Sequence, residues 1–241
     1  MKLNCDLGES FAAWKMGLDE EVMPHIDMAN IACGFHASDP DTLQKTLSLA
    51  IEHNVLIGAH PSYQDLHGFG RRSIKHSERE IINLMHYQIA AIDGMAQSQG
   101  AMVHYVKPHG ALYNDMMAKP EVFTAVVKSI HQFYRPLKLM ILATADAANY
   151  QKIAEQYSVE LIFEAFADRR YTPEGRLTPR TEQGAILNKQ QVMEQVTLLV
   201  NQGQVITNAG TPLSLKADTL CVHGDNHESV ALVKEIKALC Q

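Results

Sequence analysis

Acidic, basic and imidazole side chains recur at the ends of short apolar runs throughout this sequence. Six such endings stand out: Asn4-Cys5-Asp6, Cys33-Gly34-Phe35-His36, Gly58-Ala59-His60-Pro61, Lys107-Pro108-His109-Gly110, Asp168-Arg169-Arg170 and His223-Gly224-Asp225. Short apolar runs of this kind are typical of strands that are buried on both faces of a sheet. The carboxyl ends of strands in a closed parallel sheet surround one opening, so these residues would meet in one polar site. That arrangement indicates an enzyme.

Several of these side chains are suited to proton transfer or to charge stabilisation. Carboxylates and imidazoles act as general acids and bases, and a lysine can stabilise a developing oxyanion. His223 and Asp225 are too close in sequence to contact each other as a catalytic His–Asp dyad, so we expect them to have separate roles. We predict catalytic roles for Asp6, His36, His60, Lys107, His109, Asp168, His223 and Asp225.

A divalent metal is an alternative use for part of this set. Asp6, His36 and His60 follow three different runs and could supply oxygen and nitrogen ligands, with Glu9 nearby. Their spacing matches no compact metal motif such as HExxH. A single histidine at a strand end is also often only a hydrogen-bonded core residue, so the metal remains an open expectation.

A second set of residues is suited to binding substrate or phosphate. Arginine presents a planar fork that matches carboxylate and phosphate oxygens. Most of the arginines lie in two long segments, residues 61–76 and 168–184, and long loops at a sheet mouth often bind ligands. Surface ion pairing is the other interpretation for each arginine. The predicted binding residues are Asn4, Glu9, Asn30, Arg71, Arg72, Tyr113, Arg169 and Arg180.

The elements that must position these residues alternate between strand and helix patterns. Apolar runs predict strands over residues 3–7, 28–33, 55–59, 102–106, 137–143, 161–165 and 219–222, and the run 205–207 stays ambiguous. Asp39 before Pro40 and Ser77 before Glu80 mark helix starts. Polar residues follow nearly every strand, whereas an open doubly wound sheet gathers its site at one switch point. We therefore predict an α/β fold, a seven-stranded parallel (β/α) barrel, in one domain over residues 1–241.

Composition narrows the functional class. The 241 residues carry a net charge of −6 and show no basic stripe, which argues against nucleic acid as a partner. No apolar run approaches the roughly 20 residues that cross a bilayer, and the start resembles no signal peptide. Four cysteines without CxxC spacing are expected to be reduced thiols, so we expect a cytoplasmic protein. No P-loop, GxGxxG or GxSxG motif occurs.

Taken together, the motifs resemble those of the LamB/YcsF family. The matching segments are Leu3-Asn4-Cys5-Asp6-Leu7-Gly8-Glu9, Ala29-Asn30-Ile31-Ala32-Cys33-Gly34-Phe35-His36, Gly58-Ala59-His60-Pro61-Ser62, Phe69-Gly70-Arg71-Arg72, Val106-Lys107-Pro108-His109-Gly110-Ala111-Leu112-Tyr113, Phe166-Ala167-Asp168-Arg169 and Cys221-Val222-His223-Gly224-Asp225. The resemblance implies a barrel related to the glycoside hydrolase/deacetylase fold. It also implies ATP-driven hydrolysis of 5-oxoproline to L-glutamate, in a complex with subunits B and C.

This resemblance leads to a hypothesis for the mechanism. Phosphorylation of the lactam oxygen would make the ring carbon electrophilic. Lys107 and an arginine would hold anionic oxygens, Asp6, His60 or His109 would activate water, and His223 or Asp225 would protonate the leaving nitrogen. Two alternatives stay open: a stand-alone metal-dependent hydrolase or deacetylase, and a non-catalytic protein of the complex that only binds substrate.

Overall fold

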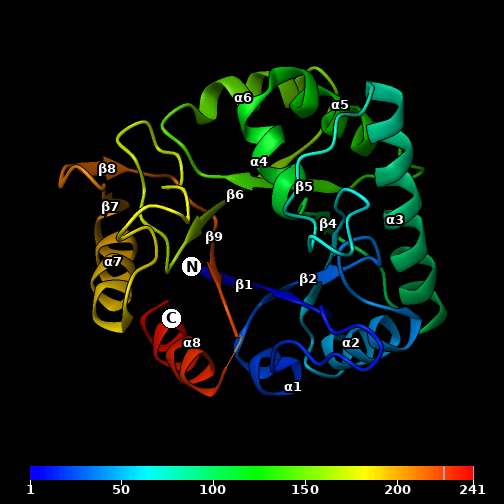
Figure 1. Cartoon of the computed structure of the whole chain (residues 1–241), viewed down its shortest axis with the longest axis horizontal. Coiled ribbons are helices and arrows are strands. Elements are labelled where there is room, and N and C mark those ends of the chain that lie inside the picture. The colour runs from blue at the N-terminus through cyan, green and yellow to red at the C-terminus, as the bar shows by residue number, and fades with distance from the viewer. Residues whose placement is uncertain (225, 241) are drawn as a thin grey trace.

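Seven parallel strands close into a barrel at the centre of the molecule (Figure 1). The computed structural model describes residues 1–224 and 226–240. Each strand pairs in parallel with the next, and the last returns to the first, which confirms the predicted seven-stranded parallel barrel. The strands are β1 (Lys2–Leu7), β2 (Met28–Ala32), β3 (Leu56–His60), β4 (Tyr105–Val106), β5 (Lys138–Leu142), β6 (Leu161–Phe166) and β9 (Thr219–Val222).

Helices surround the barrel on its outside, as Figure 1 shows. Asp39 caps α2 (Pro40–Glu52) by accepting from the Thr42 amide at 2.9 Å, and Ser77 with Glu80 forms the capping box of α3 (Glu78–Ser98), as predicted. The helices are α1 (Asp19–Val22), the 3₁₀ turn η1 (Met23–His25), α2 (Pro40–Glu52), α3 (Glu78–Ser98), α4 (Gly110–Ala118), α5 (Pro120–His131), α6 (Ala147–Glu155), α7 (Lys189–Gln202) and α8 (His227–Cys240). Among the described residues, no helix combines the length and apolarity needed to cross a membrane.

Two elements differ from the sequence-based expectation. β4 is shorter than predicted, although the His104 amide already donates to the Ile57 carbonyl at 2.8 Å just before it. The ambiguous run near residue 205 forms β7 (Gln204–Ile206), which pairs antiparallel with β8 (Pro212–Ser214) as a ribbon outside the barrel. The barrel therefore keeps its seven strands, and the ribbon sits beside α7 (Figure 1).

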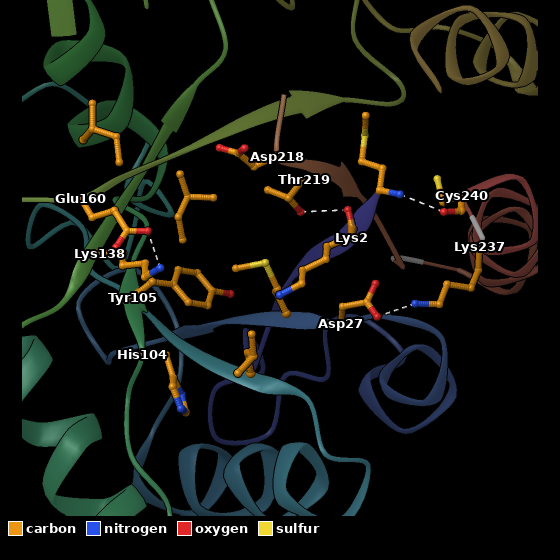
Figure 2. A pocket seen from close by; sticks show the side chains of 15 residues that line it. Lys2, Asp27, His104, Tyr105, Lys138, Glu160, Asp218, Thr219, Lys237 and Cys240 are labelled. Carbon is orange, nitrogen blue, oxygen red and sulfur yellow. Dashed lines mark hydrogen bonds and ion pairs between the residues drawn. The ribbon is translucent and has the colours of Figure 1, made fainter. Parts of the chain in front are cut away.

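The amino ends of the strands surround a cavity of about 960 Å³ (Figure 2). Ion pairs of Lys138 with Glu160 and of Lys237 with Asp27 lie along its wall. Tyr105 projects into this cavity, and its hydroxyl donates to Asn30 Oδ1 at 2.7 Å inside the barrel. Within residues 1–224 and 226–240, none of the predicted catalytic residues lines this end, so it provides a matched control surface for the opposite end.

Candidate active site

A second cavity of about 930 Å³ opens at the carboxyl ends of the strands. Both long loops contribute to it, as expected for segments at the mouth of a barrel. His36 lies directly behind the wall, stacked on His109 with ring centroids 3.7 Å apart. The predicted site residues that line the cavity are Asp6, Glu9, His60, Arg71, Lys107, His109, Tyr113, Asp168, Arg169, Arg180 and His223.

Lys107 lies between two carboxylates at the base of this cavity. Its Nζ is 3.0 Å from Asp6 Oδ1 and 2.9 Å from Glu164 Oε2. Asn4 Oδ1 and Cys221 Sγ each lie 3.4 Å away. Burial alone would lower the pKa of Lys107, but Asp6, Cys221 and Glu164 together raise it well above its usual value. Lys107 is therefore an ammonium group suited to stabilise negative charge, and it is not a base.

Asp6 is held at one oxygen and accessible at the other. Oδ1 accepts from Asn30 Nδ2 at 2.8 Å and from Lys107, while Oδ2 lies 3.4 Å from His60 Nε2. The Tyr105 hydroxyl fixes the orientation of Asn30 by donating to its Oδ1. Burial would raise the pKa of Asp6, but His60 and Lys107 lower it well below its usual value. Asp6 is therefore held as the ionised carboxylate.

Backbone carbonyls determine which nitrogens of His60 and His109 carry hydrogen. His60 Nδ1 lies 2.6 Å from the Lys107 carbonyl, and His109 Nε2 lies 2.9 Å from the Phe69 carbonyl. Since a carbonyl only accepts, both of these nitrogens must be donors. The remaining nitrogens, His60 Nε2 and His109 Nδ1, face each other at 3.0 Å. In the neutral rings both present lone pairs, so a cation or a proton between them is favourable.

Glu9 and His36 complete a group that fits a divalent metal. Glu9 Oε1 lies 3.6 Å from His109 Nδ1 and 3.1 Å from His36 Nε2. The ligand atoms of Glu9, His36, His60 and His109 all lie within 4.8 Å of one another. Imidazole and carboxylate ligands suit zinc and other first-row metals, and the carbonyl partners of the rings are typical outer-shell support. His36 Nδ1 is buried without a hydrogen-bond partner among the described residues.

This group differs from the metal set expected from the sequence. Asp6 is not a member of this group of ligand atoms, and its Oδ1 contacts Lys107 and Asn30. Glu9 and His109 join His36 and His60 instead. Burial raises the pKa of Glu9, and burial lowers the pKa of both His36 and His109. The buried environment thus favours neutral imidazoles, which is the form that binds a metal.

His223 and Asp168 form a pair across two neighbouring strands. His223 follows β9 and Asp168 follows β6, and Nδ1 lies 2.9 Å from Asp168 Oδ2. Burial would raise the pKa of Asp168, but His223 lowers it, so the carboxylate is ionised. A carboxylate at Nδ1 stabilises the imidazolium and directs Nε2 elsewhere. Asp225, the predicted neighbouring acid, lies outside the described residues.

Three predicted binding residues do not line the cavity. Asn4 and Asn30 are buried beneath it, where Asn30 Nδ2 donates to Asn4 Oδ1 at 2.8 Å. Arg72 turns away, donates from Nε to Asp65 Oδ1 at 2.9 Å, and leaves 67% of its side chain exposed. These hydrogen bonds from Arg72 lower the pKa of Asp65 to about 2. Arg72 is thus used within its own loop.

Glu164 is a charged residue of the site that was not among the predicted ones. It lies in β6 with a fully buried side chain and pairs with Lys107. Burial raises the pKa of Glu164, and burial with Glu164 raises that of Tyr113. The signal was present in the sequence, because an acid within the apolar run 161–166 requires a buried partner.

Comparisons with known proteins agree on one family. The LamB/YcsF family profile matches residues 1–241. A protein of Vibrio campbellii, named as the A subunit of 5-oxoprolinase, is 55% identical over 98% of this chain and 94% of its own length. A protein of the same name from Chromohalobacter salexigens is 52% identical over 98% of this chain and 94% of its own. The crystal structure of a lactam utilization protein from Thermus thermophilus superposes with a TM-score of 0.90 at 34% identity, covering 98% of this chain and 95% of that one.

Proposed function

The chain belongs to the LamB/YcsF family, and we propose that it is the lactam-opening component of an ATP-dependent 5-oxoprolinase. The observation that carries this proposal is the convergence of an ammonium group, a carboxylate and two imidazoles on one cavity. Relatives named for the same 5-oxoprolinase component support the substrate, 5-oxo-L-proline, and the product, L-glutamate. We further propose partner subunits B and C, a cytoplasmic location, and ATP as the co-substrate of the complex.

The proposed reaction joins phosphorylation to ring opening. ATP transfers its terminal phosphoryl group to the lactam oxygen, and water attacks the ring carbon. The carbon–nitrogen bond breaks with a proton going to the nitrogen, which leaves an acyl phosphate. A second water then hydrolyses this acyl phosphate to the carboxylate of glutamate and inorganic phosphate. Lys107, with Arg169 or Arg180, would hold the anionic oxygens. The sequence has no P-loop motif, so a P-loop of this chain does not hold the nucleotide.

The geometry divides the proton-transfer roles between two sides of the cavity. Asp6 is ionised and presents Oδ2 beside His60, so we assign it the removal of a proton from water. His223, supported by Asp168, would give a proton to the leaving nitrogen. His60 and His109 could also take the water proton if no metal occupies their facing nitrogens.

A divalent metal would be held by Glu9, His60 and His109, with His36 as a further ligand or as a donor to Glu9. When bound, such an ion lowers the pKa of water and polarises an oxygen. The same cluster favours a second candidate function, a metal-dependent amide hydrolase that acts without ATP. The lactam reaction remains the better-supported proposal because relatives and the solved structure both bear lactam-related names.

Glutamate release tests the proposal directly. We expect release by this chain together with its B and C partners in the presence of ATP, and none by the chain alone. Lys107→Ala and His109→Ala should each lower kcat by about 100-fold or more, the usual size of a lost catalytic group. Activity within about threefold of wild type in both variants is under about 1 kcal/mol of barrier and would exclude these residues from the mechanism.

Matched controls come from the opposite end of the barrel. Lys138→Ala and His104→Ala remove the same residue types from the amino-end cavity. Both should leave kcat unchanged. Release by the isolated chain without ATP, abolished by a chelator, would instead establish the metal-dependent hydrolase.

A further inference from the structure

Glu164 is the most deeply buried acid beside Lys107, and it takes no part in the proposed proton transfers. Its side chain is 0% exposed, and its Oε2 lies 2.9 Å from Lys107 Nζ. It occupies the middle of β6, where the backbone register places it beside Thr219 of β9 and Leu142 of β5. Phe166, two residues along the same strand, places its ring 5.3 Å from the same ammonium. One strand thus holds Lys107 by charge and by an aromatic face.

The two carboxylates around Lys107 are not equivalent. Asp6 lines the cavity, keeps 18% of its side chain exposed, and has a second neighbour in His60, whose Nε2 lies 3.4 Å from its Oδ2. Glu164 does not line the cavity and is enclosed by the barrel. An isolated charge in such a place is costly, so the ionised form of Glu164 depends on Lys107. Asp6 can change partners during a reaction, whereas Glu164 cannot.

We propose that Glu164 is a positioning residue that anchors the Lys107 ammonium from within the barrel. Because Glu164 contacts Lys107 from inside the barrel, the Lys107 ammonium keeps its charge and its orientation when Asp6 turns to the reacting water. The two carboxylates then have different roles. Glu164 supplies the fixed counter-charge, and Asp6 remains available for proton transfer. The catalytic part of this inference rests on the proposed lactam reaction, while the anchoring contact does not.

Substitution of Glu164 by glutamine tests the anchor. In the assembled complex with ATP, Glu164→Gln should lower kcat by at least about tenfold and leave KM within about threefold, because the amide keeps the shape and removes the charge. The control is Glu160→Gln, which lies just before the same strand and pairs with Lys138 at the other end of the barrel. The control should keep full kcat. A kcat within about threefold of wild type in Glu164→Gln would overturn the inference.

A stability cycle tests the anchoring contact without any activity measurement. Lys107→Ala leaves Glu164 buried without its cation and should lower the Tm of the isolated chain. Adding Glu164→Gln removes this unpaired buried charge, so the double variant should melt at least about 4 °C above Lys107→Ala. A residue that only fills space would make the double variant melt at or below the single one, and that result would also overturn the inference. If wild type releases no glutamate, this cycle still decides the contact.

Discussion

Arg180 and Arg72 show how the surroundings of a guanidinium decide whether it is available to a ligand. Arg180 lines the active-site cavity close enough to Arg169 for the two charges to interact: burial and then Arg180 lower the pKa of Arg169. Two like charges kept together at a cavity wall favour an anion between them. Arg72 lies outside the cavity and donates to Asp65. The same residue type therefore faces the cavity in one place and supports its own loop in the other.

This difference predicts separate outcomes for two alanine variants. Arg180→Ala should raise KM for the anionic substrate by about tenfold, or about 1.4 kcal/mol, since a single charge-assisted contact is lost. Arg72→Ala should leave KM unchanged and lower Tm, because Asp65 loses its partner. Steady-state kinetics and thermal melting measure the two effects. Equal KM changes in both variants would contradict the placement of these arginines.

At the scale of elements, a single carboxylate connects α3 to two neighbouring segments. Asp93 of α3 accepts from the Val103 amide at 3.1 Å, before β4, and from Tyr134 and Arg135, which lie between α5 and β5. Burial would raise the pKa of Asp93, but the hydrogen bonds from Arg135, Tyr134 and Val103 lower it. A lowered pKa in the folded state stabilises the fold at every pH above the ordinary value of about 3.9. That stabilisation is lost as the pH falls toward the lower, folded-state value.

Asp93→Asn should therefore cost about 1–3 kcal/mol of unfolding free energy near pH 7. It should also flatten the loss of stability below about pH 4, because the group that takes up the proton is gone. Denaturant titrations at several pH values measure both effects. Asp41→Asn, an exposed acid in the first turn of α2, is the matched control and should change little. An unaltered acid dependence in Asp93→Asn would contradict this account.

Strands buried on both faces could be predicted from the sequence. Elements whose position or length depends on the surrounding structure could not. β2 and β3 are nearly continuous apolar runs, so their positions follow from composition. α4 starts directly after His109 and buries residues on several sides, so it lacks the one-sided apolar pattern that marks a surface helix. β4 keeps only two ladder residues, a length that no pattern indicates.

The candidate site was predictable as a group of residues but not in its pairings. Strand-end positions were sufficient to bring Asp6, His60 and Lys107 together. Which histidine nitrogen faces the metal group depends on the Lys107 and Phe69 carbonyls, and a sequence does not show where a carbonyl points. The pairing of His223 with Asp168 depends in the same way on β6 and β9 being adjacent.

At the scale of the whole molecule, the candidate metal ligands connect four consecutive strands of the barrel. Glu9 follows β1, His36 follows β2, His60 ends β3 and His109 precedes α4 after β4. These strands are neighbours in the closed sheet. A ligand bound by all four segments is lost when any one of them unfolds. Binding should therefore stabilise the whole barrel and not only the mouth.

Metal addition should thus raise the Tm of the isolated chain. An ion present at 100 times its dissociation constant adds about 2.7 kcal/mol, which corresponds to roughly 5–10 °C for a chain of this size. Glu9→Gln and His109→Ala should each remove most of the rise, whereas His104→Ala and His131→Ala, which alter exposed histidines away from the cluster, should keep it. Zinc and manganese salts, tested separately, probe the nitrogen-rich and oxygen-rich preferences of the site. A rise that persists in both cluster variants would place the ion elsewhere, and no rise in wild type would leave the facing nitrogens of His60 and His109 to share a proton.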